Sequence, residues 1–313
     1  MLQFVKILNP ESVLRSSILP LILLSVVGCS TQTLKEQPSQ VAKVNVTDTK
    51  VVNDKTSSNN VATFTYKEVA GKPLKLEVHT PKNISQGQKV PAIVFFFGGG
   101  WNGGKITQFK PQSEYFTEQG LVTILVDYRV KSRNKTTPAD AVSDAKSAMR
   151  WVRTNATRLN IDANNIIASG GSAGGHLAAA TAFISDFNDP TDDLSVSPKP
   201  QALILFNPVI DNGPKGYGYA RVNKYWQRFS PLHNITSEGP PTLTMLGTRD
   251  DLIPVATGQA FDQALTAQGG ISELRLYEGQ KHGFFNKARY KETLKESHNF
   301  LFKLGYLTEA YID

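Results

Sequence analysis

A serine flanked by glycines is the pattern in this sequence with the clearest capacity for chemistry. Gly170-x-Ser172-x-Gly174 follows the apolar run 166–168 and precedes an alanine-rich segment with high helix propensity. Glycine neighbours let a strand and a helix pack closely around a sharp turn that projects the serine hydroxyl. The helix N-terminus adds unpaired N–H groups and a dipole that favours negative charge. Ser172 is therefore a candidate nucleophile for acyl transfer; the alternative, a mere Gly/Ser-rich loop, is disfavoured by the strand and helix flanks.

A serine nucleophile needs a base, and the sequence has five histidines from which to choose it. The turn resembles the nucleophile elbow of the α/β-hydrolases, and this resemblance implies that the acid and then the base follow the serine along the chain. His282 fits best, because it lies in a glycine-containing loop after the predicted strand that ends at Tyr277. His176 lies one helical turn beyond Ser172, where we expect it to pack beneath the turn. The remaining histidines are His79, His233 and His298.

The acid that orients the base should follow the strand before the histidine loop. Two adjacent carboxylates, Asp250 and Asp251, follow the apolar run 241–246. We assign the acid to Asp250, because Asp251 is closer to the next helix and can cap it. The alternative is that Asp251 is the acid and Asp250 caps the helix.

A run of glycines, residues 98–100 and 103–104, follows an early apolar strand. Glycine lets the backbone bring its N–H groups close to a substrate oxygen, so this loop is a candidate oxyanion site. A phosphate-binding loop is the alternative, but no Lys-Ser or Lys-Thr pair completes such a motif.

The surrounding pattern predicts an α/β fold with a mostly parallel sheet flanked by helices. Alternation predicts two antiparallel strands near 63–66 and 74–79, with Gly71 between them. Nearly continuous apolar runs predict buried strands near 90–97 and 121–128. Further strands are expected near 166–169, 201–206, 241–246 and 272–277. Helices are expected at 109–119, 138–160, after Ser172, and at 287–303.

Two irregular stretches, 186–199 and 211–240, interrupt this alternation. The second contains five aromatic residues, and we expect it to form a lid or substrate wall, or else a small packed cap. These aromatic residues are Tyr217, Tyr219, Tyr225, Trp226 and Phe229.

The N-terminus predicts export and lipidation. Basic residues precede an apolar run, 18–28, that is too short to span a bilayer comfortably. Val26-Val27-Gly28-Cys29 resembles a bacterial lipobox, and Cys29 is the only cysteine in the chain. We expect a signal peptide at 1–28, a flexible tether with lipidated Cys29 at 29–61 and one catalytic domain at 62–313; an ordinary cleaved signal is the alternative. Ser30 in place of aspartate favours the outer membrane of a Gram-negative cell.

The chain has 313 residues, of which 40% are hydrophobic and 19% are charged, as in ordinary globular proteins. Its formal net charge is +7, but the lysines and arginines are scattered along the sequence. We therefore expect a solvated basic surface and no nucleic-acid partner.

In order and across most of the chain from about residue 63, several segments resemble the α/β-hydrolase family, in its hormone-sensitive-lipase-like and polysaccharide-esterase branch. The segments are Phe96-Phe97-Gly98-Gly99-Gly100-Trp101, Val126-Asp127-Tyr128-Arg129, Gly170-Gly171-Ser172-Ala173-Gly174-Gly175-His176, Gly247-Thr248-Arg249-Asp250 and His282-Gly283-Phe284. The sequence departs from many relatives at one position, because Phe97 stands where they have histidine. The bracing of this loop must therefore differ.

The resemblance implies a role for each matching residue. Ser172 would be the nucleophile, with Asp250 and His282 as its partners. The oxyanion hole would be formed by the N–H groups of Gly99, Gly100 and Ala173.

We therefore expect a lipid-anchored serine carboxylesterase that acts on acetyl-like or aromatic esters, including those of polysaccharides, with no metal or organic cofactor. A peptidase or amidase with the same triad is the first alternative. A non-catalytic binding lipoprotein is the second, although no triad member is missing. The membrane, reached through the lipid, is the expected macromolecular partner; the sequence does not indicate an oligomeric state.

Overall fold

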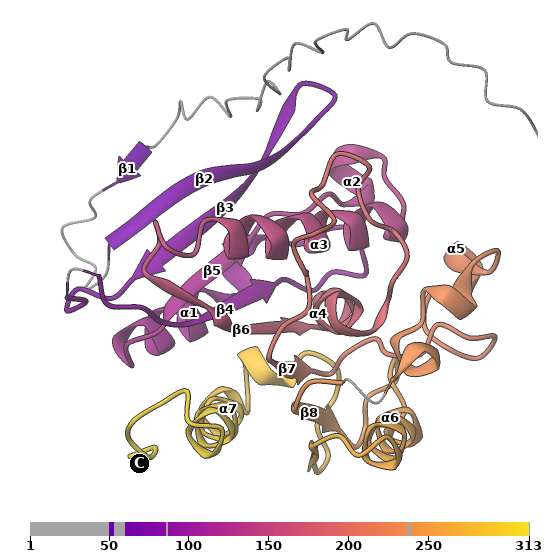
Figure 1. The fold of residues 1–313 in the computed structure, drawn as a ribbon. Helices are drawn as coiled ribbons and strands as arrows, with labels where there is room; N and C mark the ends of the chain where they lie inside the picture. The colour runs from indigo at the N-terminus through magenta and orange to yellow at the C-terminus, as the bar shows by residue number, and fades with distance from the viewer. Residues whose placement is uncertain (1–49, 53–59, 86, 237–238, 313) are drawn as a thin grey trace, which may run out of the picture. The chain divides into compact units, whose positions relative to one another are not determined.

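Strands and helices alternate along most of the chain, in the manner of an α/β protein (Figure 1). The computed structural model describes residues 50–52, 60–85, 87–236 and 239–312, all within the unit Val46–Asp313. The predicted signal peptide and Cys29 lie outside the described residues. In the range predicted as tether, 29–61, the described residues 50–52 and 60–61 are strand.

The described strands form one nine-stranded sheet in the order β1-β2-β3-β5-β4-β6-β7-β8-β9. The pairs from β1 to β5 are antiparallel, and all pairs from β5 to β9 are parallel. The strands are β1 Lys50–Val52, β2 Asn60–Val69, β3 Lys72–Thr80, β4 Val90–Phe96, β5 Val122–Val126, β6 Ile161–Gly171, β7 Ala202–Phe206, β8 Thr242–Gly247 and β9 Ser272–Tyr277.

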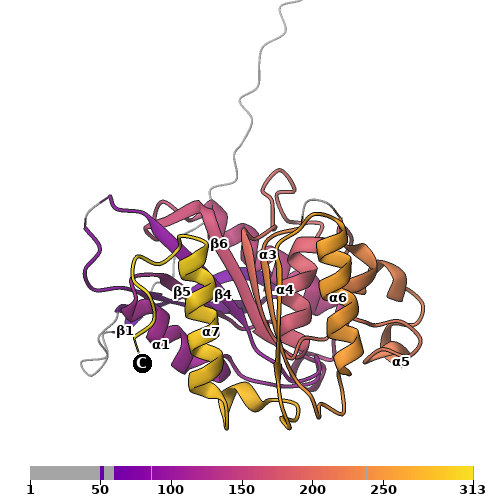
Figure 2. The same cartoon turned by 90° about the horizontal axis from the view of Figure 1, so that it is seen from below.

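Helices cover both faces of the sheet, which explains why the central strands are apolar at nearly every position. Apolar residues of α3, α4 and α6 join one core, and those of α1 and α7 join the other. Figure 2 shows α1 and α7 side by side. The helices are α1 Lys110–Glu118, α2 Lys131–Asn134, α3 Pro138–Thr154, α4 Ala173–Phe183, α5 Tyr219–Val222, α6 Val255–Ala267 and α7 Tyr290–Lys303, with 3-10 turns at Ile106–Phe109, Trp226–Arg228, Pro231–Asn234 and Phe284–Asn286.

The predicted fold class and order of elements are confirmed, whereas some element ends differ. The helix expected at 138–160 ends at Thr154, where the side-chain amide of Asn155 donates to the carbonyl of Trp151 and so satisfies one of its terminal acceptors. The strand before Ser172 begins five residues earlier than expected, at Ile161. The last helix begins at Tyr290, three residues later than expected.

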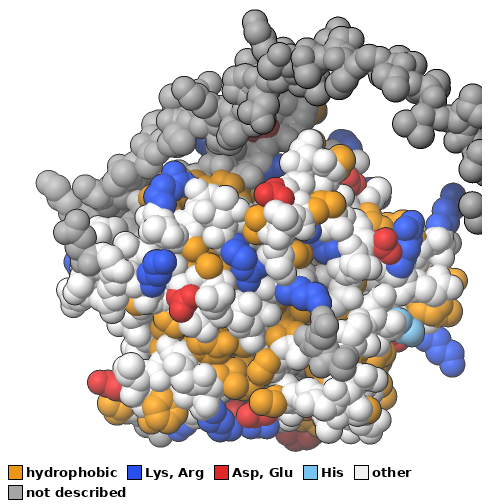
Figure 3. Space-filling model, in the orientation of Figure 1, with side chains coloured by type: hydrophobic (Ala, Val, Ile, Leu, Met, Phe, Trp, Pro, Cys, Tyr) orange, Lys and Arg blue, Asp and Glu red, His pale blue; other side chains and the backbone are white. Residues whose placement is uncertain are grey.

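The basic side chains are dispersed on the face seen in Figure 3, as the sequence predicts. None of the described helices has the length and apolar character that crossing a bilayer requires.

Candidate active site

Ser172 lies at the turn between β6 and α4, with backbone angles φ 54° and ψ −119°. A non-glycine residue rarely adopts this conformation, and its neighbours stabilise it through hydrogen bonds. The Ser172 N–H donates to the carbonyl of Phe206, and the Ser172 carbonyl accepts from the N–H groups of His176 and Val209. The serine is therefore held rigidly at the carboxyl end of the central strand.

The structure brings Ser172, His282 and Asp250 together, although they come from three separate loops. His282 Nε2 lies 2.8 Å from Ser172 Oγ, and His282 Nδ1 lies 2.7 Å from Asp250 Oδ2. With a proton on Nδ1, the imidazole donates to the carboxylate and accepts from the serine hydroxyl. This arrangement allows the imidazole to take the serine proton and allows Asp250 to stabilise the imidazolium.

The two adjacent carboxylates differ in their surroundings. The side chain of Asp250 is fully buried, and its Oδ1 accepts from the backbone N–H groups of Leu252 and Ile253 at 2.9 and 3.0 Å. Asp251 is exposed. The expectation that Asp251 caps the next helix is wrong, because α6 begins at Val255 with Pro254 as its N-cap residue.

Asn207 supports the imidazole and was not identified from the sequence. This fully buried side chain follows β7, accepts from the Gly283 N–H at 3.1 Å through Oδ1, and places Nδ2 3.4 Å from His282 Nε2. The available signal was its position, since a polar residue directly after a buried parallel strand lies at the edge where such sites form.

The glycine-rich loop lies beside Ser172, where Gly98, Gly99 and Gly100 line the same pocket as the serine. Gly100 has a φ of 61°, which favours glycine, and a β-carbon there would lie 2.7 Å from the Tyr217 hydroxyl. Ala173, the first residue of α4, directly follows the serine. Of the residues expected to form an oxyanion hole, Gly99 and Gly100 thus line the pocket with Ser172, and Ala173 follows the serine in the chain.

A hydrogen-bond network joins this loop to the histidine loop. The side-chain oxygen of Gln108 accepts from the Gly98 N–H at 2.5 Å, and the Gln108 carbonyl accepts from Asn286 Nδ2 at 2.8 Å. Gln112 Nε2 donates to Asn286 Oδ1 at 2.6 Å. No sequence motif indicates this network, because it joins residues about 175 positions apart.

Phe97, at the start of the glycine-rich loop, is braced by Tyr128. Its ring stacks on Tyr128 with centroids 4.1 Å apart, and the Tyr128 hydroxyl donates to the Phe97 carbonyl at 2.6 Å. Aromatic stacking thus accompanies a backbone hydrogen bond at the base of the loop.

The pocket that holds Ser172 measures about 290 Å³, and glycines and polar residues form much of its lining. Leu252 and Phe285 supply apolar surface, and Tyr217 is the aromatic residue of 211–240 that lines it. Phe229, Tyr225 and Trp226 instead pack against other aromatic rings. Both expectations for this segment therefore hold in part: Tyr217 forms part of a wall, and Tyr225, Trp226 and Phe229 belong to a packed cap.

His176 is buried beneath the turn, as expected. Its ring stacks on Phe229 with centroids 4.3 Å apart, and Nε2 lies 3.0 Å from the Phe229 carbonyl, to which it can donate. Burial lowers the pKa of His176 to about 3, so the ring is neutral at physiological pH. The other histidines, His79, His233 and His298, do not line the pocket that holds Ser172.

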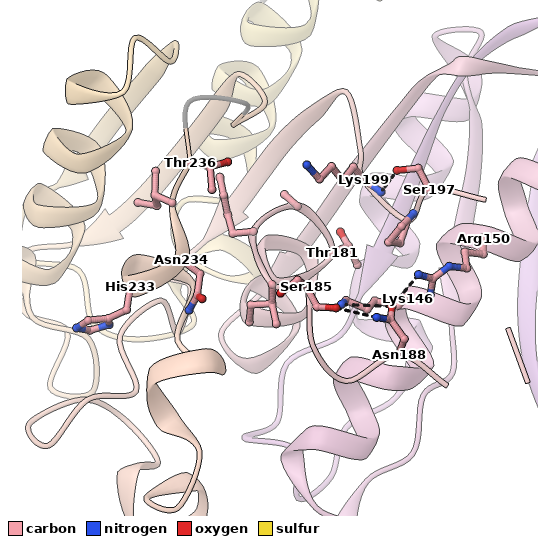
Figure 4. A pocket seen from close by; sticks show the side chains of 15 residues that line it. Lys146, Arg150, Thr181, Ser185, Asn188, Ser197, Lys199, His233, Asn234 and Thr236 are labelled. Carbon is pink, nitrogen blue, oxygen red and sulfur yellow. Dashed lines mark hydrogen bonds between the residues drawn. The ribbon is translucent and has the colours of Figure 1, made fainter. Parts of the chain in front are cut away.

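A second pocket, of about 480 Å³, lies between α3, the end of α4 and the segments 185–199 and 233–236 (Figure 4). Its buried cations hold the first of these segments. Lys146 Nζ donates to the Asp186 carbonyl, and Arg150 donates to Asn188 Oδ1 and pairs with Asp192. Burial lowers the pKa of Lys146 to about 8.

The sheet order, the strained serine after a central strand and the partners on later loops define an α/β-hydrolase with a serine site. Comparisons with known proteins agree with this class. The BD-FAE family profile matches residues 76–216, and that of the prolyl oligopeptidase family matches residues 206–305.

Solved structures identify the family. Esterase 2 of Thermogutta terrifontis, in its form phosphoramylated by tabun, is 41% identical, with a TM-score of 0.76 over 80% of this chain and 97% of that one. Its butyrate-bound form is 40% identical, with a TM-score of 0.75 over 80% and 96% of the two chains. The chain therefore belongs to the esterases of the α/β-hydrolase family.

Curated relatives show a weaker but consistent similarity. Esterase LipQ of Mycobacterium tuberculosis is 29% identical over 64% of this chain and 52% of that esterase. An acetylxylan esterase of Xylanibacter ruminicola is 29% identical over 62% of this chain and 41% of that enzyme. The chain spans about half the length of these curated relatives.

Proposed function

We propose that the protein is a serine carboxylesterase that hydrolyses short acyl esters through an acyl-enzyme. The observation that carries this proposal is the pair of hydrogen bonds, 2.8 and 2.7 Å long, that joins Ser172 to His282 and His282 to Asp250. The burial of Asp250 and its two backbone donors keep this carboxylate in place.

In the proposed reaction, His282 Nε2 takes the proton of Ser172 Oγ as the oxygen attacks the ester carbonyl. The N–H groups of Gly99, Gly100 and Ala173 stabilise the resulting oxyanion. The imidazolium then gives its proton to the leaving alcohol. Water, deprotonated by the same imidazole, attacks the acyl-enzyme and releases the acid.

A short acyl group is supported by the small size of the pocket, about 290 Å³, and by the apolar side chains of Leu252 and Phe285 in its wall. The propionate and butyrate bound in the Thermogutta terrifontis structures point the same way. Similarity to an acetylxylan esterase favours acetyl groups on polysaccharides as natural substrates, with aromatic esters as a further class.

A peptidase or amidase activity is the second candidate, because the prolyl oligopeptidase profile matches the part of the chain that holds Asp250 and His282. Relative rates on acetyl, butyryl, feruloyl and peptide substrates separate these candidates. A fluorophosphonate probe separates both from a binding protein, which it would not label.

The mechanism is tested with p-nitrophenyl acetate and the variants Ser172→Ala and Asp250→Asn, each checked for native circular dichroism. We expect kcat to fall about a thousandfold or more in each, through loss of the nucleophile or of the carboxylate that orients the imidazole. Full activity in Ser172→Ala would end the proposal.

We also propose that residues 1–28 are a signal peptide and that lipid on Cys29 anchors the catalytic domain to the bacterial cell envelope, on the extracytoplasmic side. The apolar run, the single cysteine and its lipobox-like context support this proposal. Ser30 favours the outer membrane in a Gram-negative cell.

A further inference from the structure

An arginine lies beside the catalytic pocket on the side formed by Gly100 and Tyr217. Arg221, from α5, donates from Nη1 to the Gly100 carbonyl at 2.5 Å. Its guanidinium carbon lies 5.0 Å from the ring centroid of Trp101 and 5.4 Å from that of Tyr217. Because Gly100 and Tyr217 line the pocket, these contacts fix a cation next to the expected oxyanion hole.

The guanidinium of Arg221 carries an uncompensated charge within the described parts of the chain. Arg221 is exposed, and among the described residues it has no carboxylate partner. Arg228, in the same segment, does have one, since it pairs with Asp186 at 3.8 Å. The Arg221 atoms Nε and Nη2 have no acceptor within the described parts of the chain, so they remain available to a ligand.

The rest of the site adds no negative charge at the pocket wall. The described residues that line it include no aspartate or glutamate. In sequence, the segment 211–240 has four basic residues and two acidic ones. The surroundings of Arg221 therefore favour an anion.

We propose that Arg221 determines specificity by binding a carboxylate on the alcohol part of the ester, so that the preferred substrates are short acyl esters of carboxylate-bearing alcohols such as sugar acids. This inference rests on the proposed esterase function. Because the proposed acyl group is short, the carboxylate that Arg221 binds must belong to the alcohol part of the ester. The planar fork of arginine, already oriented by its two aromatic contacts, suits a carboxylate better than an ammonium would.

The experiment compares 4-acetoxybenzoate with 4-acetoxybenzamide, which share the acetyl group and nearly the same shape but differ in charge. Each kcat/KM is divided by the rate constant of the compound's hydroxide-catalysed hydrolysis, which removes the difference in leaving groups. We expect the native enzyme to favour the carboxylate about tenfold at low salt, and less at 0.5 M NaCl because exposed charges are screened.

Arg221→Gln should abolish this preference by lowering kcat/KM for the carboxylate much more than for the amide, while Arg221→Lys should retain part of it. Arg228→Gln is the matched control, because Arg228 is also exposed and lies 5.4 Å from an aromatic ring centroid, that of Phe187, but does not contact the pocket loop. This control should keep the native preference.

Two results would overturn the proposal: a native enzyme without the preference, or an Arg221→Gln variant that slows both substrates equally, which would make Arg221 only a brace for Gly100. Failure of the esterase function looks different. In that case neither compound would be hydrolysed faster by the native protein than by Ser172→Ala.

Discussion

At the scale of single residues, the site depends on which polar groups are buried with a partner. Asp250 is buried, but it accepts from His282 and from two backbone N–H groups, so its charge is stabilised. His176 is also buried, yet it faces a carbonyl and aromatic rings, and it therefore stays neutral. His282, which contacts the Asp250 carboxylate, and His176, which does not, thus have different environments near the same serine.

The lowered pKa of His176 predicts a pH dependence of stability. Its pKa is about 3 in the folded protein and about 6.5 in the unfolded chain, so the unfolded state binds more protons between these values. The contribution of His176 to the free energy of unfolding is therefore fully present above pH 6.5. It falls as the pH decreases toward 3, by up to about 1.4 kcal/mol per pH unit.

The variant His176→Phe tests this dependence by urea unfolding between pH 7 and pH 4.5. We expect it to be less stable at pH 7 by about 1 to 3 kcal/mol, because the Phe229 carbonyl loses its donor. The difference from the native protein should shrink as the pH falls. Parallel stability curves would contradict the prediction.

Residue types and chain order pointed to Ser172 and His282, because a tight turn and a glycine-containing loop have local signatures. They favoured Asp250 as the acid but left Asp251 as an alternative. That choice depends on burial, which is a property of the folded chain.

At the scale of elements, the close approach of the start of α4 to the end of β4 sets the position of the serine. A β-carbon on Gly174 would lie 2.0 Å from the carbonyl oxygen of Phe96, so only glycine lets the helix approach this strand. The same approach brings Ser172 next to the glycine-rich loop that follows β4.

The variant Gly174→Ala should therefore be destabilised by about 3 kcal/mol, since the backbone must shift to accommodate the methyl group. Gly103→Ala is the control, because a β-carbon there has its nearest neighbour, Ser132 Oγ, at 3.9 Å. It should stay within about 0.5 kcal/mol of the native protein. Chemical denaturation measures both, and equal stabilities would refute the steric argument.

Most elements could be predicted because buried parallel strands are continuous apolar runs and helices have their own period. The residues at which helices and strands begin and end were less predictable. The helix α3 ends at Thr154 although apolar residues continue beyond it, because the chain must turn there to enter β6.

At the scale of the whole molecule, the proposed anchor decides where the enzyme meets its substrate. Cys29→Ser should abolish incorporation of labelled palmitate, because no other cysteine exists to accept the lipid. The measurement is labelling combined with membrane fractionation of cells that produce each protein. A Cys29→Ser protein that stayed membrane-bound and labelled would refute the proposal, whereas Ser30→Asp should keep the label and move to the inner membrane.

The sequence by itself indicated the family, the candidate nucleophile and the order of strands and helices, because these depend on motifs and periods within short stretches of chain. Only the tertiary structure decided which groups meet at the serine. His282 lies 110 positions from Ser172, and Arg221 lies 121 positions from Gly100. Such pairs come together because parallel strands end at one edge of the sheet, where loops distant in sequence must share the same space.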